Sequence, residues 1–151
     1  MIRCLGACLL SAAAALPATA APSHLDAIVQ RGALRVCTTG DYPPHSLLRA
    51  DGRYEGIDIT LAQSLAASLQ VQVQWVPTRW PTLLPDLLAD RCDIAVGGIS
   101  VSLPRQRQAW FSAVLEVDGK IPLVRCADRA RYRAIAQIDR PELRVIEPRG
   151  G

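Results

Sequence analysis

Apolar side chains recur with a period of two in short stretches of the chain, and this pattern predicts β-strands. Val71, Val73 and Trp75 alternate with glutamines, and residues 34–38 read Leu-Arg-Val-Cys-Thr. Successive side chains of a strand point to opposite faces of a sheet, so alternation is typical of a strand with one buried face. A third short strand is predicted at the apolar run that begins at Asp93.

Other stretches have the longer period of a helix. Four apolar residues lie four positions apart and define a single apolar helical face: Ile57, Leu61, Leu65 and Leu69. This spacing predicts an amphipathic helix over residues 58–69. A shorter helix is predicted over residues 23–31, because Ser23 and Asp26 resemble a capping pair and Gly32 suits the stop.

A leucine-rich helix after Pro81, ending near Arg91, completes an alternating order of strand, helix, strand, helix and strand. This order predicts an α/β fold with a parallel-rich sheet covered by helices. Ligands of such sheets bind at the carboxyl ends of the strands. Three candidate site segments follow predicted strands, and we expect them to converge on one cleft: Tyr42, Trp80 and Ser100–Arg105.

The last third of the chain has a weaker pattern. An extended piece is predicted over residues 114–125, broken by Asp-Gly at 118–119. A weak helix over residues 131–139 and a strand over residues 143–146 follow. A glycine turn after a strand normally opens a helix, so the sequence is expected to be the amino-terminal portion of a longer protein. We see no internal repeat and no low-complexity linker.

The glycine turn after the third strand is the strongest candidate for chemistry. Gly97 and Gly98 carry no Cβ, so a ligand can approach their backbone closely. Ser102 suits the N-cap of a short helix, whose first N–H groups attract anions. Arg105 adds a planar pair of donors that matches a carboxylate. The pattern predicts a site for a small carboxylate-bearing ligand.

Composition is that of a globular protein, because half of the residues are hydrophobic and 21% are charged. The formal net charge of +3 is too small to indicate a nucleic-acid partner. Residues 1–20 are read as a cleaved signal peptide, with Arg3, a short apolar run and an A-x-A site that ends at Ala20. We therefore expect an exported, periplasmic protein without a later membrane span.

Three cysteines follow this leader: Cys37, Cys92 and Cys126. Export predicts an oxidising compartment, but an odd number leaves at least one thiol unpaired. Cys37 and Cys92 lie in apolar stretches, where buried structural thiols are the simpler interpretation. Cys126 is a candidate for a disulfide whose partner lies outside this sequence. No metal site is predicted, because the sequence has no C-x-x-C pair and only 2 histidines.

Several motifs follow one another in a specific order: Gly-Asp-Tyr-Pro-Pro at 40–44, Gly-Ile-Asp at 56–58, Trp80 before the leucine helix, residues 93–105, and Phe-Ser at 111–112. In this order the chain resembles the periplasmic solute-binding proteins of the polar amino-acid transport type. The resemblance implies two lobes with the ligand trapped between them. It implies that residues 21–117 form lobe one, and that residues 118–151 form a crossing strand and the start of lobe two.

A narrower set of motifs covers residues 23–151: Thr-Thr-Gly-Asp-Tyr at 38–42, Pro-Thr-Arg-Trp-Pro at 77–81, residues 105–112, Asp-Gly-Lys at 118–120 with Pro122, Cys126, and Gln-Ile-Asp at 137–139 with Pro141. These are similar to the cyclohexadienyl dehydratases, a branch of this family that removes water and carbon dioxide from prephenate or arogenate. The resemblance implies a catalytic lysine at Lys120 and a general acid in lobe two, where no residue is assigned here. His45 departs from the phenylalanine usual in the family.

Each candidate residue also has a purely structural interpretation. Tyr42 and Trp80 either flank a flat ligand or are ordinary packing aromatics. Arg105 is favoured as a carboxylate clamp over a surface arginine because of its glycine lead-in. Lys120 is equally well explained as a lysine on the surface of the hinge. The predicted substrate-binding set is completed by Gly98, Ser100 and Ser102. Loop, turn or cap roles are favoured for His45, Asp41, Asp58 and Asp93.

The leading hypothesis is a dehydratase, a carbon–oxygen lyase acting on prephenate or arogenate without a metal or organic cofactor. The alternative is a non-enzymatic binding protein of an amino-acid ABC transporter, which passes its ligand to a membrane permease. A carboxylate clamp serves both. A third interpretation is that the chain as given does neither, because one wall of the cleft lies outside it.

Overall fold

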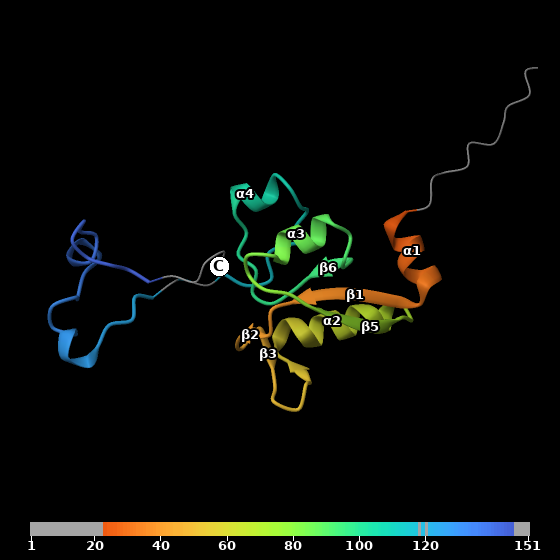
Figure 1. The fold of residues 1–151 in the computed structure, drawn as a ribbon, viewed down its shortest axis with the longest axis horizontal. Helices are drawn as coiled ribbons and strands as arrows, with labels where there is room; N and C mark the ends of the chain where they lie inside the picture. The colour runs from red at the N-terminus through yellow and green to blue at the C-terminus, as the bar shows by residue number, and fades with distance from the viewer. Residues whose placement is uncertain (1–22, 118, 120, 147–151) are drawn as a thin grey trace, which may run out of the picture.

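A parallel sheet forms the centre of the protein (Figure 1). The computed structural model describes residues 23–117, 119 and 121–146. The sheet has three strands, in the order β5-β1-β6: β1 (Ala33–Thr38), β5 (Gln72–Pro77) and β6 (Ile94–Ala95). Both outer strands run parallel to β1, and Val36 pairs with Trp75 on one side and with Ile94 on the other. The predicted α/β class and its three strands are confirmed.

A second, antiparallel sheet follows β1 and has three short strands: β2 (Asp41–Tyr42), β3 (Ser46–Leu48) and β4 (Tyr54–Glu55). Strand β3 pairs with both neighbours, and the predicted turn at Asp51 and Gly52 connects it to β4. The hydroxyls of Thr38 and Ser46 are buried and lie 2.6 Å apart. This hydrogen bond joins the antiparallel sheet to the carboxyl end of β1.

The α-helices of the described residues are α1 (His24–Arg31), α2 (Ile57–Ser68), α3 (Leu83–Leu88) and α4 (Leu103–Gln106). Helix α1 begins as predicted, because Ser23 and Asp26 form a capping box, and Gly32 ends it in the left-handed conformation. In Figure 1, α3 lies above β1 and α2 lies below it. In the part of the chain that the structure describes, no helix has the length and apolar character needed to span a membrane.

Helix α2 forms as predicted but buries a different face. Ile57, Leu61 and Leu65 of the predicted apolar face are 43–49% exposed, so most of this face does not pack against the sheet. The residues that pack inward are Ile59, Ala62 and Ala66. Small alanines let the helix approach the sheet closely, whereas Leu61 and Leu65 line a hollow of about 470 Å³. The hollow borders β6 at the edge of the sheet and is walled by α3 on its other side.

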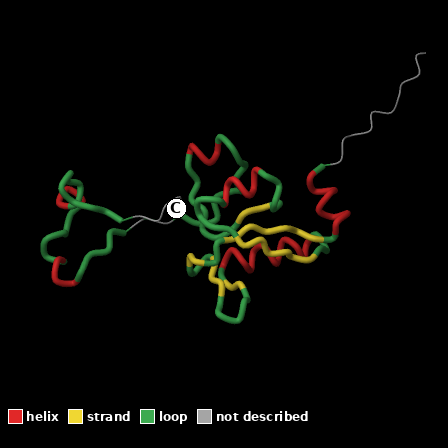
Figure 2. The backbone as a smooth tube through the Cα atoms, in the orientation of Figure 1, coloured by secondary structure: helices red, strands yellow, loops and turns green. Residues whose placement is uncertain are grey.

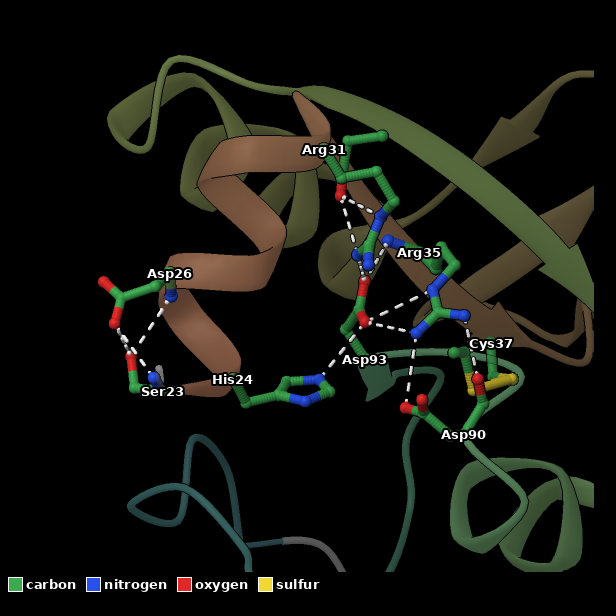
Figure 3. A network of polar contacts seen from close by, with 10 residues as sticks. Ser23, His24, Asp26, Arg31, Arg35, Cys37, Asp90 and Asp93 are labelled. Atoms are coloured by element: carbon green, nitrogen blue, oxygen red, sulfur yellow. Dashed lines mark hydrogen bonds and ion pairs between the residues drawn. A yellow bond between two sulfur atoms is a disulfide. The ribbon is translucent and has the colours of Figure 1, made fainter. Parts of the chain in front are cut away.

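Helix α1 is attached to the sheet through Asp93, whose side chain is fully buried (Figure 3). Asp93 accepts hydrogen bonds from the Arg35 backbone N–H at 2.7 Å and from the Arg35 guanidinium at 2.8 Å. Arg31 also donates to Asp93, and His24 Nε2 lies 3.2 Å from it. Burial raises the pKa of Asp93, but the hydrogen bonds and charges of the arginines outweigh it and hold the pKa below its ordinary value.

Cys37 of β1 and Cys92, just before β6, form a disulfide across 55 residues of sequence. Both residues are buried. The interpretation as two buried free thiols is therefore wrong. The apolar surroundings indicated burial correctly, but three cysteines allow several pairings, and the pairing depends on the parallel contact of β1 with β6. Cys126 is free and exposed.

Residues 121–146 lie apart from the sheet and consist mostly of loop (Figure 2). Two short 3₁₀ turns occur there, at Cys126–Asp128 and Ile135–Gln137. Residues 143–146 contain no strand, so the strand predicted there is wrong, and the weak helix is reduced to the second turn. The described part of residues 114–125 joins neither sheet. A strand needs a partner for its backbone groups, and these segments have none in the sheets. The predicted signal peptide lies outside the described residues.

Candidate functional site

The predicted glycine turn comes directly after β6 and packs against residues from β1 to β3. Gly97 and Gly98 have φ angles of 130° and 69°, a region that favours glycine. A Cβ on Gly97 would lie 3.3 Å from the Thr38 hydroxyl oxygen. A Cβ on Gly98 would lie only 2.7 Å from carbon atoms of the Tyr42 and His45 rings. Two aromatic rings therefore rest directly on the backbone of this turn.

The amide groups of the turn are held by a carboxylate of the chain itself. Asp58 Oδ2 accepts from the Gly97 N–H at 3.0 Å and from the Gly98 N–H at 2.7 Å. Asp58 lies in the first turn of α2, where the helix dipole favours a negative charge. The sequence indicated a cap residue at this position. Its partners lie 39 and 40 residues away in sequence, so no local pattern could have identified them.

Tyr42 and Trp80 form a corner of two aromatic rings beside the turn. Their centroids lie 5.8 Å apart and the planes are perpendicular, which is a favourable edge-to-face arrangement. The Trp80 indole N–H donates to Asp41 Oδ1 at 3.0 Å, so the indole is fixed to the strand that carries Tyr42. Tyr42 is 44% exposed, and part of its ring therefore remains available to a ligand.

The loop that carries Trp80 is fixed at its base. The Thr78 hydroxyl donates to Asp86 of α3, and Arg91 Nη1 donates to the same carboxylate at 2.8 Å. The Thr78 hydrogen bond is the main cause of a lowered pKa at Asp86, and the Arg91 hydrogen bond adds to it. These contacts connect the position of Trp80 to the start of α3.

Arg105 lies on α4 and turns back toward the segment that precedes it. Its Nη1 donates to the Ser100 carbonyl oxygen at 2.9 Å. Ser102 has the backbone conformation of an N-cap, but its side chain makes no capping hydrogen bond, so that part of its predicted role is wrong. Pro104, the second residue of α4, has no N–H, so one of the two donors that an N-cap side chain usually binds is missing.

The structure thus brings Tyr42, Trp80 and Gly98 into one cluster and places Arg105 against Ser100 on the following segment. Lys120 lies outside the described residues. Roles in substrate binding stay predictions for Tyr42, Trp80, Gly98, Ser100 and Arg105, and so does the catalytic role of Lys120. Sequence reasoning missed three supporting residues, which were interpreted as loop, turn or cap residues: Asp41, His45 and Asp58.

One group of possible metal ligands occurs among the described residues, away from this cluster. Ligand atoms of His24, Asp90 and Asp93 lie within 4.8 Å of one another. Asp93 already accepts from two arginine side chains, and Arg35 also lies 3.3 Å from the Asp90 carboxylate. A cation at this position would face two guanidinium groups, so we interpret the group as a structural ion-pair network.

Comparison with known proteins places these residues in a wider context. The profile of the bacterial extracellular solute-binding proteins, family 3, matches residues 34–143. A cyclohexadienyl dehydratase from Pseudomonas aeruginosa is 45% identical over all 151 residues of this chain, which span 56% of that enzyme's length. The chain therefore corresponds to little more than half of this relative.

Two solved structures resemble the fold. An ancestral cyclohexadienyl dehydratase is 51% identical and superposes with a TM-score of 0.65 over 83% of this chain and 52% of the other. An ancestral amino acid-binding protein, described as a precursor of cyclohexadienyl dehydratase, is 35% identical, with a TM-score of 0.75 over 80% of this chain and 53% of the other. The likeness thus extends to an enzyme and to a binding protein.

Proposed function

This chain belongs to family 3 of the bacterial extracellular solute-binding proteins, and we propose that the protein binds a cyclohexadienyl carboxylate and dehydrates it. The substrate class is prephenate or arogenate. The observation that carries this proposal is the corner formed by Tyr42 and Trp80 above Gly98. The faces of these two aromatic rings can pack against a flat, unsaturated six-membered ring. The similarity to a cyclohexadienyl dehydratase supports the same substrate class.

Each site residue has a proposed task. Arg105 binds a substrate carboxylate through its guanidinium, and the backbone and hydroxyls of Gly98, Ser100 and Ser102 position that carboxylate. Tyr42 and Trp80 flank the ring and exclude water from it. Lys120 contacts a carboxylate or polarises the leaving hydroxyl. The proton donor is assigned to none of the described residues.

The proposed reaction balances without a redox step. Prephenate takes up one proton at its ring hydroxyl, and the carbon–oxygen bond breaks as water leaves. The bond to the ring carboxylate breaks at the same stage, carbon dioxide is released, and the electron pair of that bond completes the aromatic ring of phenylpyruvate. Arogenate gives phenylalanine in the same way. Placement of charge and delivery of one proton are therefore the chemistry that the protein supplies.

The test is incubation of the purified protein with prephenate, with the formation of phenylpyruvate as the readout. We expect turnover above the spontaneous rate, and we expect Arg105→Gln to reduce it. Arg107→Gln is the matched control, because Arg107 is an exposed arginine two residues away. Absence of turnover combined with tight binding of a free amino acid would contradict the enzyme proposal.

A second candidate function is a binding protein of an amino-acid ABC transporter, which passes its ligand to a permease. The likeness to an ancestral amino acid-binding protein supports this candidate. The same assay separates the two functions, because a transporter component binds its ligand and returns it unchanged. Equilibrium binding of amino acids, measured by calorimetry on the protein used for turnover, completes the distinction.

We further propose that the protein acts outside the cytoplasm, in the periplasm. The extracellular character of the family supports this location, and so does the buried disulfide between Cys37 and Cys92. Structural disulfides persist in oxidising compartments and are rare in the cytosol. Cell fractionation of the producing bacterium, followed by mass determination of the amino terminus, tests both export and the predicted cleavage after Ala20.

A further inference from the structure

The imidazole of His45 lies between the aromatic corner and the carboxylate that holds the glycine turn. It stacks on the Tyr42 ring, with centroids 5.4 Å apart and 16° between the planes. Its Nδ1 lies 3.7 Å from Asp58 Oδ1, and its side chain is only 12% exposed. The backbone makes the same two connections, because the His45 N–H donates to the Tyr42 carbonyl and the Asp58 N–H donates to the His45 carbonyl.

Asp58 is shared between two partners. Its Oδ2 accepts both amide groups of the turn, whereas its Oδ1 faces the imidazole across 3.7 Å. That separation is too long for a hydrogen bond. A protonated imidazole is a cation with a donor on each ring nitrogen, and a carboxylate that is 15% exposed attracts it more strongly than a carboxylate in bulk water does.

If the His45 ring moves, the residues packed against it must move as well. The rings of Tyr42 and His45 both rest on Gly98, where a Cβ would already lie at 2.7 Å. The titratable groups that face the imidazole are Tyr42 from β2 and Asp58 from α2. A histidine changes its charge between about pH 5 and 8. The Asp58 carboxylate responds most strongly to that charge, and the π face of the stacked Tyr42 ring attracts the cation as well.

We propose that His45 is a positioning residue of the ligand site: its protonation closes the gap to Asp58 and draws the Tyr42 wall and the Gly97–Gly98 turn together. Ligand binding is therefore tighter on the acidic side of neutrality. This inference rests on the proposed function, because it assumes that Tyr42 and the turn contact the ligand. His45 acts through these residues and touches no reacting atom.

The first experiment needs no ligand. In ¹⁵N-labelled protein, the amide signals of Gly97 and Gly98 are followed from pH 8 to 5.5. We expect both signals to shift over the pH range in which a histidine gains its proton. His45→Phe and Asp58→Asn remove the shift, whereas His24→Asn preserves it, because His24 lies on α1 at the other end of β6. Signals that do not titrate, or that titrate equally in His45→Phe, overturn the proposal.

The second experiment measures binding of L-phenylalanine, whose charge is constant over this pH range. We expect the affinity to rise about fivefold from pH 8 to 5.5, which corresponds to about 1 kcal/mol, and to be independent of pH in His45→Phe. Equal affinity at both pH values in the unaltered protein contradicts the proposal. Failure to bind L-phenylalanine at any pH counts against arogenate, whose product it is, and against an amino-acid ligand, while the amide titration alone decides the coupling of His45 to Asp58.

Discussion

The two ends of strand β6 are each held by an aspartate, but with different partners. At the start of the strand, the Asp93 side chain is fully buried and accepts hydrogen bonds from Arg31 and Arg35. Both of these partners are cations. At the far end, Asp58 is 15% exposed and accepts from the neutral amides of the glycine turn. One short strand therefore connects a charge-paired anchor to a turn whose backbone amides are held by a carboxylate.

The difference separates stability from function. Removing one member of a buried ion pair leaves an uncompensated charge, so the Asp93 end tolerates little change. Hydrogen bonds from neutral amides are weaker and allow the carboxylate to take a second partner. The turn can then adjust to His45 or to a ligand while the start of β6 stays in place. The experiments below test this division, from the largest expected effect to the smallest.

Asp93→Asn should have the largest effect on folding. It removes the carboxylate that Arg31 and Arg35 share and leaves Arg35 with only the exposed Asp90. We expect the free energy of unfolding to fall by about 3–5 kcal/mol. Urea denaturation measures the change. Asp90→Asn is the matched control, because Asp90 also pairs with Arg35 but is 72% exposed, and we expect less than about 1 kcal/mol from it. Equal effects of the two variants would show that burial does not determine how much each ion pair contributes to stability.

Acid should weaken the same anchor. The pKa of Asp93 is lower in the folded protein than in the unfolded chain, so its contribution to stability is complete above the ordinary aspartate value and is lost as the pH falls below about 4. Asp86, whose pKa is also lowered, adds to this acid dependence. We expect Asp93→Asn to flatten the fall in unfolding free energy below pH 4. A fall of unchanged steepness would assign the acid dependence to other groups.

Arg105→Gln should affect binding more than folding. Loss of a charge-assisted hydrogen bond to a ligand carboxylate costs about 1.5–3 kcal/mol, or roughly 10- to 150-fold in affinity. Calorimetric titration with the ligand identified by the turnover and binding assays measures this loss, and Arg107→Gln is expected to leave the affinity unchanged. A large loss of stability in Arg105→Gln would instead indicate that its contact with Ser100 is structural.

Tyr42→Leu should give the smallest effect. A contact between the Tyr42 ring and a ligand ring is worth about 0.5–1.5 kcal/mol beyond the buried area, and we expect a loss of ligand affinity of that order. Loss of the edge-to-face contact with Trp80 lowers the free energy of unfolding by a similarly small amount. Tyr54→Leu is the control. Tyr54 packs on Trp75, with ring centroids 5.3 Å apart, and its burial raises its pKa. We expect this control to lower stability and to leave affinity intact; the reverse outcome would exchange the roles of the two tyrosines.

Local sequence signals predicted local structure well. The Ser23 capping box, the alternation over residues 71–75 and the Asp51-Gly52 turn all correspond to observed features, because each depends on neighbours within a few residues. The parallel order of the strands followed from the strand–helix alternation. These signals were sufficient for the fold class and for the position of the glycine turn.

Local sequence signals could not predict contacts between residues that are distant in sequence. The pairing of Asp58 with the turn and of Cys37 with Cys92 spans 39 to 55 residues, and nothing in either local pattern names the partner. The spacing of Leu61 and Leu65 correctly predicted a helical face. It could not show that this face borders a hollow beside β6. The period of a sequence pattern identifies a helical face but not the residues that pack against that face.

The disulfide between Cys37 and Cys92 has a consequence for the order of events during folding. Parallel pairing of β1 with β6 requires the chain to close a loop of more than fifty residues, and such distant contacts form slowly because the entropy of loop closure is lost before any contact is gained. Once the two thiols are oxidised, the strands are neighbours along the covalent framework. The search that aligns them then becomes local, and oxidation of the two thiols becomes the step that determines how fast the sheet assembles.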